Sequence, residues 1–435
     1  MYLHVNTFIL SFVSNIMAQE VIEPEYRVAI VTHKIRAFAS LDAPRVGIVY
    51  KNDVFESGPI VGYTDCAAGW SKVGPGVICL VKTEVVSETP SVLPSFMDVL
   101  PPDSEDQTEL RFATEREPSF MPVLFATRDD DHDGRLWASI EELEAGDSHR
   151  WKLKRGKDYR FVAAHQSQKG WILERPNGSV TLMSDVYVYP VSRFSGRDFR
   201  DFPKKNDGSM AWVNNPHGAM VYWTDSEEQA SGIMLERRRI LEIELSEDNA
   251  EWVKIPMGDV DGFVQRSALR VWESVDKPDG IEEDEVWIDA DVSSQMFSVF
   301  VGDDLLFTTL MSTAKKGHST PLGTYQIYDK AVGWDLGSKE GSDDAYYMED
   351  VPFVMHYYPR YAIHSAFWHD NFGEPASHGC INLSPKDAWT VYQLVSPDMP
   401  DGWQYIKQHK EDPGTVVRIR DGQTVGKRKR IAPKY

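Results

Sequence analysis

One segment near the end of the chain combines a cysteine, a glycine and several polar residues in a spacing suited to nucleophilic catalysis. The segment Ser377 to Asn382 (SHGCIN) places Cys380 directly after Gly379, and His364 lies sixteen residues before the cysteine. A thiol becomes an effective nucleophile when a nearby base takes its proton and backbone amides stand where the attacked carbonyl oxygen develops charge. A free thiol with a pKa of about 8.5 is only slightly ionised at neutral pH. We therefore predict that Cys380 attacks a carbonyl and that His364 accepts its proton.

These residues resemble the signature of a known enzyme family. The segment Tyr361 to Trp368 (YAIHSAFW), a loop, and then Ser377 to Asn382 are similar to the signature of the L,D-transpeptidases, the YkuD-type catalytic domain. The similarity extends upstream, in the order and spacing of that family, through Val286 to Asp291, Phe297 to Thr313, and the turn Thr320 to Tyr325 (TPLGTY). It covers about one third of the chain, from near Val286 to near Arg420.

The resemblance implies acyl transfer on peptidoglycan through a cysteine thioester. Cys380 would attack the bond between the third residue of a stem peptide and its terminal D-alanine, release D-alanine, and pass the acyl group to an amine of a neighbouring stem. Ser365 corresponds to the residue that orients the histidine through a hydrogen bond, for which a backbone carbonyl would serve as well as a hydroxyl. The resemblance implies no cofactor.

The resemblance also assigns roles to the loop around the cysteine. The backbone N–H groups of His378, Gly379 and Cys380 are expected to form the oxyanion hole, and Gly379 allows a sharp turn because it has no Cβ. Ser377, His378 and Asn382 are expected to hold the loop and line the site. A purely structural role for these three polar residues is equally consistent with the sequence.

Aromatic residues outside the loop resemble the substrate cleft of the family. Trp368, and Tyr346 with Tyr347, match its lid and cleft wall. Core packing is the alternative for each of them, because aromatic side chains contribute most to buried surfaces.

Two patterns raise the question of a bound metal. Four histidines and a cysteine fall within twenty-five residues of one another: His356, His364, His369, His378 and Cys380. Neither a His-Glu-x-x-His nor a paired Cys-x-x-Cys motif accompanies them, so we predict no metal there.

The run Asp129 to Gly134 (DDDHDG) places carboxylates at positions 1, 3 and 5 of a calcium loop and glycine at position 6. Position 12 is Ile140, and the glutamate comes one residue late. We therefore predict an Asp-Gly hairpin between Phe125-Ala126 and Leu136-Trp137 instead.

The composition describes a multidomain globular protein. Its 435 residues, 42% of them apolar and 11% aromatic, can bury two or three cores. The net charge of −21 argues against nucleic acid as the main partner, because phosphate binding needs clustered Lys and Arg. The partners that the resemblance implies are peptidoglycan stem peptides.

The first residues indicate export. Residues 1–18 contain the apolar run Phe8 to Val13 and end at Ala18, as in a signal peptide, although no Lys or Arg precedes the run. A buried strand or short helix is the alternative. The run is too short to span a bilayer, and no other segment is a transmembrane candidate. We expect a location in the periplasm or cell wall.

The three cysteines fit an oxidising compartment. Cys66 and Cys79 lie close together and could form a disulfide, which would leave Cys380 free. Two reduced, buried cysteines are equally consistent with the sequence.

Strand-like segments separated by Gly, Pro, Asp and Asn turns predict a mainly β protein. Residues 26–86 resemble a bacterial SH3-like module, and the parallel between Trp70-x-Lys72-Val73 and Trp252-x-Lys254-Ile255 suggests a second copy. These modules would bind the wall or position the catalytic domain. The expected organisation is a signal peptide (1–18), an SH3-like module (26–86), a Pro-rich linker (87–110), a β-rich region with the second module (111–272), an acidic linker (273–285), the catalytic domain (286–420) and a basic tail (421–435).

The catalytic domain is expected to be β-rich with few helices. Trp287 to Asp291 and Met296 to Val301 read as strands joined at Ser293-Ser294. One helix should begin at Ser384 as N-cap and Pro385 at the first helical position, and pack beneath the loop of Cys380.

Three alternatives to transpeptidation remain open at this point. Water could replace the acceptor amine, which would make the enzyme an L,D-carboxypeptidase on the same fold. The NlpC/P60 type of wall peptidase places its cysteine before its histidine, whereas here His364 precedes Cys380. A wall-binding protein with a silent catalytic domain would not need the complete set of site residues.

Overall fold

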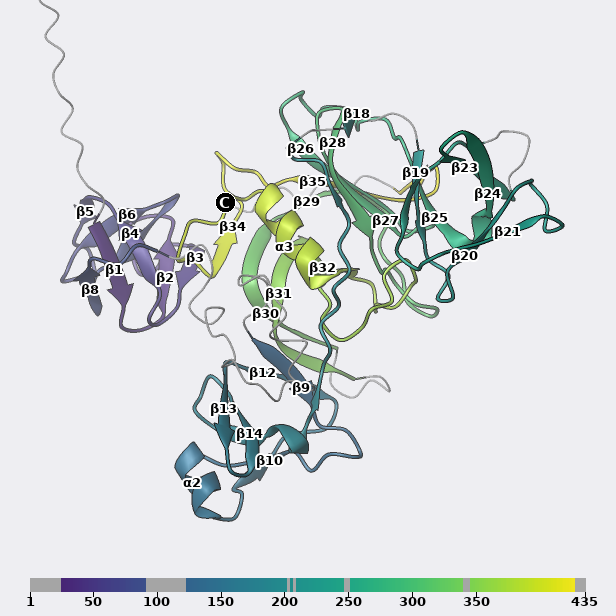
Figure 1. Cartoon of the computed structure of the whole chain (residues 1–435). Helices are drawn as coiled ribbons and strands as arrows, with labels where there is room; N and C mark the ends of the chain where they lie inside the picture. The colour runs from purple at the N-terminus through teal and green to yellow at the C-terminus, as the bar shows by residue number, and fades with distance from the viewer. Residues whose placement is uncertain are drawn as a thin grey trace, which may run out of the picture.

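The structure is a computed structural model that describes residues 25–90, 123–201, 204–205, 209–245, 251–338 and 345–426. The predicted signal peptide, most of the Pro-rich linker and the end of the basic tail lie outside these residues. The described chain is mainly β, and its two α-helices are α2 (Ile140–Ala145) and α3 (Pro385–Leu394). We divide it into an N-terminal unit (25–90), a second unit (123–201), a third unit (209–273) and a C-terminal domain (286–426) (Figure 1).

The strands follow one another in small groups along the chain. The N-terminal unit contains β1 (Glu25–Ala29), β2 (His33–Arg36), β3 (Arg45–Val49), β4 (Val54–Ser57), β5 (Ile60–Gly62), β6 (Trp70–Val73), β7 (Gly76–Cys79) and β8 (Thr83–Val86). The second unit contains β9 (Leu124–Thr127), β10 (Arg135–Leu136), α2, β11 (Trp151–Lys152), β12 (Lys157–Phe161), β13 (Ala163–Ser167), β14 (Gly170–Glu174), β15 (Val180–Leu182), the 3-10 helix η2 (Met183–Asp185), β16 (Tyr187–Val188) and β17 (Arg197–Asp198).

After the short strand β18 (Lys204–Lys205), the third unit and the C-terminal domain continue the series. The third unit contains β19 (Ser209–Val213), β20 (Ala219–Tyr222), β21 (Ala230–Leu235), β22 (Ile240–Glu242), β23 (Trp252–Met257), β24 (Val260–Gln265), the 3-10 helix η3 (Arg266–Ala268) and β25 (Leu269–Glu273). The C-terminal domain contains β26 (Val286–Asp291), β27 (Met296–Val301), β28 (Asp304–Leu310), β29 (Gly323–Gln326), β30 (Asp329–Gly337), β31 (Tyr347–Tyr358), β32 (Tyr361–Ser365), β33 (Ile381–Leu383), α3, β34 (Tyr405–Lys407), β35 (Val416–Asp421) and β36 (Thr424–Val425).

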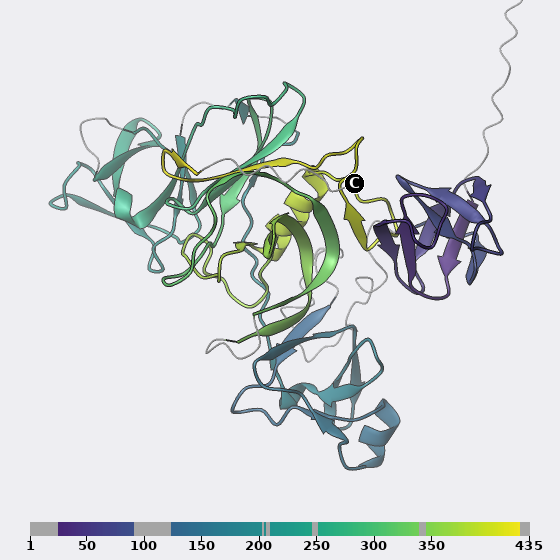
Figure 2. The ribbon, with the colours of Figure 1, turned by 180° about the vertical axis from the view of Figure 1, so that it is seen from behind.

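Two sheets and one helix enclose the core of the C-terminal domain. One sheet contains β28-β27-β26-β35-β29, and the other contains β34-β30-β31-β32-β33. The core side chains come from both sheets and from α3, and include Ile288, Phe297, Phe307, Met355, Ile363, Ile381, Ala388 and Val391. Figure 2 shows the long strands β30 and β31 curving beside α3. Both predicted strands are confirmed, the first beginning one residue earlier than predicted, at Val286, and they pair from Val286↔Val301 to Asp291↔Met296.

The predicted helix is also confirmed. Ser384 is the N-cap of α3 and its hydroxyl accepts from the N–H of Asp387, while Pro385 opens the first turn, where its missing N–H costs nothing. The apolar positions Ala388 and Val391 are fully buried. The helix contacts β31, β32 and β33, so it lies against the strands that carry the candidate site.

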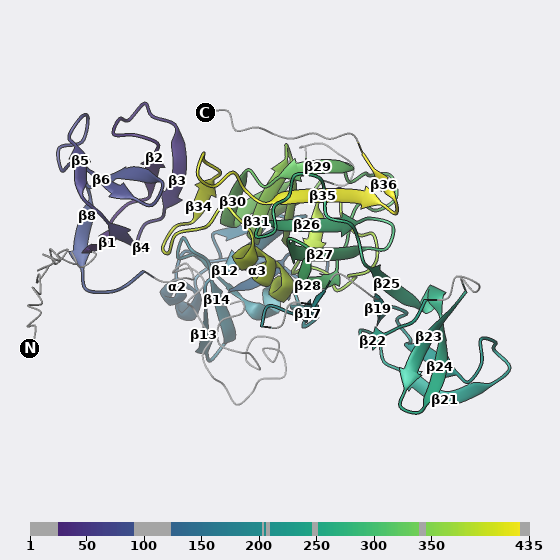
Figure 3. The same ribbon diagram turned by 90° about the horizontal axis from the view of Figure 1, so that it is seen from above.

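The N-terminal unit is joined to the C-terminal domain by a continuous sheet. β3 pairs antiparallel with β34, and Trp403 and Ile406 pack in the core of the N-terminal unit beside Val49 and Phe55. The described strands of this unit form sheets without a closed barrel, so the SH3-like assignment remains a prediction. Seen from above, the N-terminal unit and the third unit lie at opposite ends of the molecule (Figure 3).

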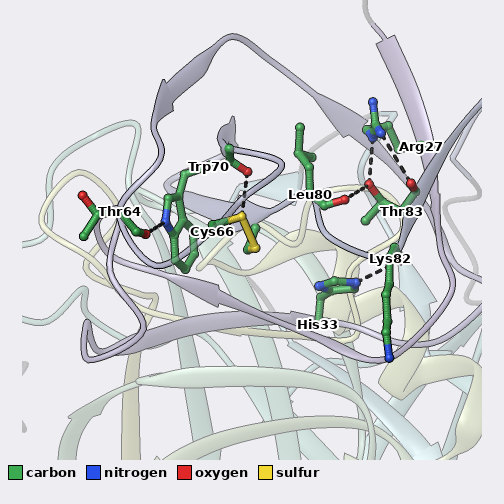
Figure 4. Close-up of a disulfide and its surroundings, with 10 residues drawn as sticks. Arg27, His33, Thr64, Cys66, Trp70, Leu80, Lys82 and Thr83 are labelled. Atoms are coloured by element: carbon green, nitrogen blue, oxygen red, sulfur yellow. Dashed lines mark hydrogen bonds between the residues drawn. A yellow bond between two sulfur atoms is a disulfide. The ribbon is translucent and has the colours of Figure 1, made fainter.

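The two sequence segments compared as a repeat both form hairpins. Trp70 begins β6, which pairs with β7, and Trp252 begins β23, which pairs with β24. Both indoles are buried. In the first hairpin, Cys66 and Cys79 form a disulfide with Cα atoms 5.8 Å apart (Figure 4).

One local expectation was wrong. The run Asp129 to Gly134 does not form a hairpin, because β9 pairs with β12 and β16, whereas β10 pairs with β11 in another sheet. Its carboxylates instead bind side chains nearby, since Asp129 contacts His132 at 2.6 Å and Asp130 pairs with Arg155. In the segment predicted as an acidic linker, 273–285, Ile281 is buried in a core cluster with Trp287. Local spacing could not reveal the pairing of β9 and β10, since their partner strands lie elsewhere along the chain.

Within the part of the chain that the structure describes, no helix has the length and apolar character needed to cross a bilayer.

Candidate active site

Adjacent parallel strands bring the predicted base and nucleophile together. β32 carries His364 and pairs with β33, in the register Ile363↔Ile381 and His364↔Asn382. Cys380 immediately precedes β33. Side chains at paired positions share a face and alternate along each strand, so Cys380, Asn382 and His364 lie on one face while Ile363 and Ile381 point into the core.

The imidazole of His364 is held in one tautomer. Its Nδ1 lies 2.9 Å from the backbone carbonyl oxygen of Ser365 and donates its hydrogen there, which leaves Nε2 as the proton acceptor. The side chain is buried, and this burial lowers the pKa of His364 to about 4, although the bond to Ser365 opposes the shift. His364 is therefore neutral and able to accept a proton at neutral pH.

Cys380 is the free cysteine among the described residues. Burial raises the pKa of its thiol to about 11, and its sulfur lies 3.9 Å from the carbonyl oxygen of Arg360. At neutral pH the pair is thus a thiol beside a neutral imidazole, not a thiolate beside an imidazolium.

Ser365 orients the histidine through its carbonyl and not through its hydroxyl. The hydroxyl oxygen is fully buried and has no hydrogen-bond partner among the described residues. The buried phenol of Tyr357 is also without a partner there, and burial together with the nearby Cys380 raises its pKa.

The loop before Cys380 is fixed by hydrogen bonds from both sides. The N–H of Gly379 donates to Ser377 Oγ at 3.0 Å, and Ser377 Oγ donates to the carbonyl of Cys380 at 2.6 Å. Thr320 Oγ1 donates to the carbonyl of Gly379 at 2.9 Å and accepts from the N–H of Ala314 at 3.1 Å. The turn containing Thr320 therefore helps to build the site, a role the sequence did not reveal because Thr320 is distant from Cys380 along the chain.

Gly379 is required by its backbone conformation and by close packing. Its φ is +135°, and a Cβ at this position would lie 2.6 Å from the Tyr361 ring and 2.9 Å from the carbonyl oxygen of Ser319. Because the Gly379 N–H is used by Ser377, this glycine shapes the loop in the present structure. The oxyanion hole expected here then depends on the amides of His378 and Cys380.

Asn382 contacts a histidine that the sequence analysis considered only as a metal ligand. Its side-chain amide lies 3.1 Å from Nε2 of His369, and Nδ1 of His369 accepts from the N–H of Asn371 at 3.2 Å. Burial lowers the pKa of His369 to about 4, so the ring that contacts Asn382 Nδ2 is neutral at neutral pH, while Asn382 Oδ1 has no hydrogen-bond partner among the described residues.

The predicted aromatic residues divide into two groups. The ring centroid of Trp368 lies 5.8 Å from that of His364, and Tyr346 lies 4.9 Å from His378. Tyr347 points elsewhere, because its hydroxyl donates to Asp335 at 2.7 Å and Lys157 of the second unit lies over its ring. The alternation of side chains along β31 explains why neighbours in sequence have different surroundings.

His318, which the sequence analysis did not single out, also reaches the site. Its ring centroid lies 4.5 Å from that of His378. Among the described residues, no group of three His, Cys, Asp or Glu side chains is arranged to hold a metal ion.

The part of the chain that carries the site is similar to known proteins. Residues 285–419 match the sequence model of the YkuD family, described as the L,D-transpeptidase catalytic domain. YciB of Bacillus subtilis, which carries a provisional L,D-transpeptidase name, is 28% identical over 27% of this chain and 68% of its own length. L,D-transpeptidase 1 of Mycobacterium tuberculosis is 31% identical over 26% of this chain, a match that spans about half (47%) of the relative.

Part of the chain also matches solved structures. The catalytic domain of the Enterococcus faecium L,D-transpeptidase is 22% identical, with 31% of this chain and 97% of that chain covered and a TM-score of 0.25. The L,D-transpeptidase from Mycobacterium smegmatis is 18% identical, with 54% and 90% covered and a TM-score of 0.26.

Proposed function

We propose, from the YkuD L,D-transpeptidase catalytic domain at residues 285–419, that this protein cross-links peptidoglycan stem peptides through a thioester on Cys380. The observation that carries the proposal is the pairing of a free cysteine with a neutral histidine on adjacent strands. His364 donates from Nδ1 to Ser365, so its Nε2 is available for the proton of Cys380.

The first half-reaction forms the acyl-enzyme. The Cys380 sulfur attacks the carbonyl carbon of the bond between the third stem residue and D-alanine while its proton passes to Nε2 of His364. The amides of His378 and Cys380 stabilise the oxyanion of the tetrahedral intermediate. The intermediate then collapses, His364 returns the proton to the departing amine, and D-alanine leaves behind a thioester.

The second half-reaction regenerates the enzyme. An amine of a neighbouring stem attacks the thioester carbonyl and gives a proton to His364. Collapse of the second tetrahedral intermediate forms the new amide bond, and the departing sulfur regains the proton from His364. Water in place of the amine would yield a free tripeptide, which is the carboxypeptidase alternative.

The location and the front units belong to the same proposal. We place the protein outside the cytoplasm, in the periplasm or cell wall, and the disulfide between Cys66 and Cys79 supports an oxidising compartment. SH3-like wall binding by the N-terminal unit and the third unit remains a proposal. A wall-binding protein with an inactive domain is less favoured, because Cys380, His364 and Gly379 are all present and the register of β32 with β33 puts Cys380 and His364 on one face of the sheet.

Product analysis tests this function. The purified protein is incubated with a disaccharide-tetrapeptide, and the products are followed by mass spectrometry alongside Cys380→Ala and a Cys66→Ala/Cys79→Ala double variant. Cross-linked dimer from wild type and from the double variant, but not from Cys380→Ala, is the expected result. Tripeptide without dimer would favour the carboxypeptidase. Absence of turnover, with no adduct of a carbapenem on Cys380, would refute an enzymatic role.

A further inference from the structure

The segment between the base and the nucleophile depends on another unit of the chain for its hydrogen bonds. Residues 370–373 form neither helix nor strand, so their backbone carbonyls need donors from elsewhere. The carbonyl of Asn371 accepts from Ser312 Oγ at 2.9 Å, within the C-terminal domain. The three other carbonyls of this loop, which we call the 370–373 loop, all accept from arginines of the third unit.

Arg238 makes the central contacts. Its Nη2 donates to the carbonyl of Asp370 at 2.8 Å, and its Nη1 donates to the carbonyl of Phe372. The side chain is 16% exposed, and its guanidinium lies 4.4 Å from the centroid of the Phe194 ring. Burial lowers its pKa to about 10, so it remains charged at neutral pH. A planar guanidinium presents its donors in a rigid fork, which fixes the two carbonyls relative to each other more tightly than the compact ammonium of a lysine would.

Two further arginines complete the contact. Arg237 donates to the carbonyl of Asp370 at 3.0 Å, and Arg270 Nε donates to the carbonyl of Gly373 at 2.7 Å. The 370–373 loop and the third unit are closely packed at Gly373, because a Cβ on this residue would lie 2.5 Å from the side-chain oxygen of Asn214. The third unit therefore fits closely against the loop as well as bonding to it.

The loop connects directly to the reactive pair. The N–H of Asn371 donates to His369, and His369 contacts Asn382, two residues beyond Cys380. Trp368, next to His369 in sequence, lies beside the ring of His364. The 370–373 loop therefore adjoins the two residues that contact the site strands: Trp368 lies beside His364 of β32, and His369 contacts Asn382 of β33.

We propose that the third unit is a positioning element of the active site, in which Arg237, Arg238 and Arg270 hold the 370–373 loop so that His369 and Trp368 fix Asn382 and His364 around Cys380. This role differs from the wall binding suggested by the sequence. It rests on the proposed function only in taking Cys380 as the nucleophile. The three arginines act through the loop and do not touch the reacting atoms.

The matched comparison uses arginines of the same unit. Arg238→Ala and Arg270→Ala remove contacts to the loop, while Arg266→Ala removes only an exposed pair with Glu273 and serves as the control. Acylation of Cys380 by a carbapenem is measured by intact-mass kinetics, with circular dichroism melting on each variant. We expect acylation to slow at least about tenfold in the two loop variants, with folded fractions like that of the control. Arg238→Lys should restore only part of the rate.

A double-mutant cycle separates positioning from general stability. In the His369→Ala background, Arg238→Ala should slow acylation by a smaller factor than in the wild type, because the path through His369 is already broken and the path through Trp368 remains. Equal losses in both backgrounds would overturn the proposal, as would wild-type acylation by Arg238→Ala and Arg270→Ala. If Arg238→Ala fails to fold, the same double-mutant cycle is carried out with Arg270→Ala, and the same outcomes support or overturn the proposal.

A second readout does not depend on enzymatic activity. The titration of His364 is followed by NMR in wild type and in Arg238→Ala. A loosened loop should admit water and move the pKa of His364 from about 4 towards 6.5, and an unchanged titration in the folded variant would overturn the proposal. Failure of the proposed function would instead appear as a wild-type protein that titrates as expected yet does not turn over stem peptides.

Discussion

The protonation states of Cys380 and His364 predict an unusual pH dependence of acylation. With a thiol pKa of about 11 and an imidazole pKa of about 4, both groups are neutral throughout the range between these values. The fraction of thiolate at pH 7 would be on the order of one in ten thousand. We therefore expect the rate of acylation to be flat from about pH 5 to about pH 10, and to fall below pH 4 as His364 is protonated.

The size of the pKa difference determines when the proton moves. Transfer from Cys380 to His364 before attack would cost roughly 10 kcal/mol, because about seven pKa units separate the groups and each is worth about 1.4 kcal/mol. Proton transfer should therefore accompany formation of the carbon–sulfur bond. His364→Gln should lower acylation at pH 7 by about 10²- to 10⁴-fold, the usual contribution of a general base. The rate of this variant should then rise about tenfold per pH unit, as the thiolate forms.

Stopped-flow acylation by a carbapenem across this pH range is the assay, repeated in deuterium oxide. A normal solvent isotope effect in wild type, lost in His364→Gln, is expected. A wild-type rate that climbs between pH 6 and 9, or strong thiolate absorbance at neutral pH, would show a thiolate–imidazolium pair and refute the reasoning.

The acid limb needs one control, because folding also depends on His364. Its pKa is lowered from 6.5 to about 4, so the unfolded chain binds more protons in this interval. The contribution of the neutral histidine to stability is therefore complete above pH 6.5 and is lost as the pH falls to 4, by roughly 3 kcal/mol. Circular dichroism at each pH separates loss of fold from protonation of the base.

Other substitutions have definite expected results. Ser365→Ala should change acylation less than about threefold, because the hydroxyl has no hydrogen-bond partner among the described residues and the carbonyl holds His364. Gly379→Ala should slow acylation more than about tenfold, because its φ of +135° and the nearby ring leave no room for a Cβ. Thr320→Val should lower the free energy of unfolding by about 1–3 kcal/mol, measured by urea denaturation, since two buried backbone groups lose their partner. Reduction of the Cys66–Cys79 disulfide should destabilise the N-terminal unit by about 3 kcal/mol in a thermal melt, and the rate of acylation of Cys380 should not change.

For each of these four predictions, the opposite experimental result would contradict the physical explanation given. A large loss in Ser365→Ala would show that the hydroxyl orients the imidazole. Acylation by Gly379→Ala at the wild-type rate would mean that the loop can adopt another backbone path, and Thr320→Val of unchanged stability would mean that water replaces the hydroxyl. Slower acylation after reduction would couple the disulfide to the site.

Local pattern was sufficient for some elements and insufficient for others. The strand pair beginning at Val286 and the helix beginning at Pro385 could be predicted, because alternation, turn residues and an N-cap are local signals. The pairing of β12 with β31, and the separation of residues 123–201 from 209–273, arise from contacts between distant segments. Neither the hydrophobic periodicity nor the turn residues of the sequence indicate contacts between distant segments.

The same distinction applies to the site. Cys380 and His364 could be selected from residue type and spacing, and the carbonyl of Ser365 was among the expected orienting groups. The contribution of Thr320 could not be found in this way, since the hydroxyl that fixes the Gly379 carbonyl lies 59 residues away along the chain. Tyr347 shows the opposite case, because an aromatic residue next to the cleft in sequence faces the second unit in space.

The shared sheet of the N-terminal unit and the C-terminal domain has a mechanical consequence. β3 and β34 are hydrogen-bonded neighbours, and Gln404 Nε2 also donates to Asp53 across the junction at 2.8 Å. The N-terminal unit therefore cannot swing on a tether without breaking strand pairing. If the N-terminal unit binds a surface, Cys380 is held at a fixed distance and orientation relative to that surface. The N-terminal unit would then limit which bonds the nucleophile can reach.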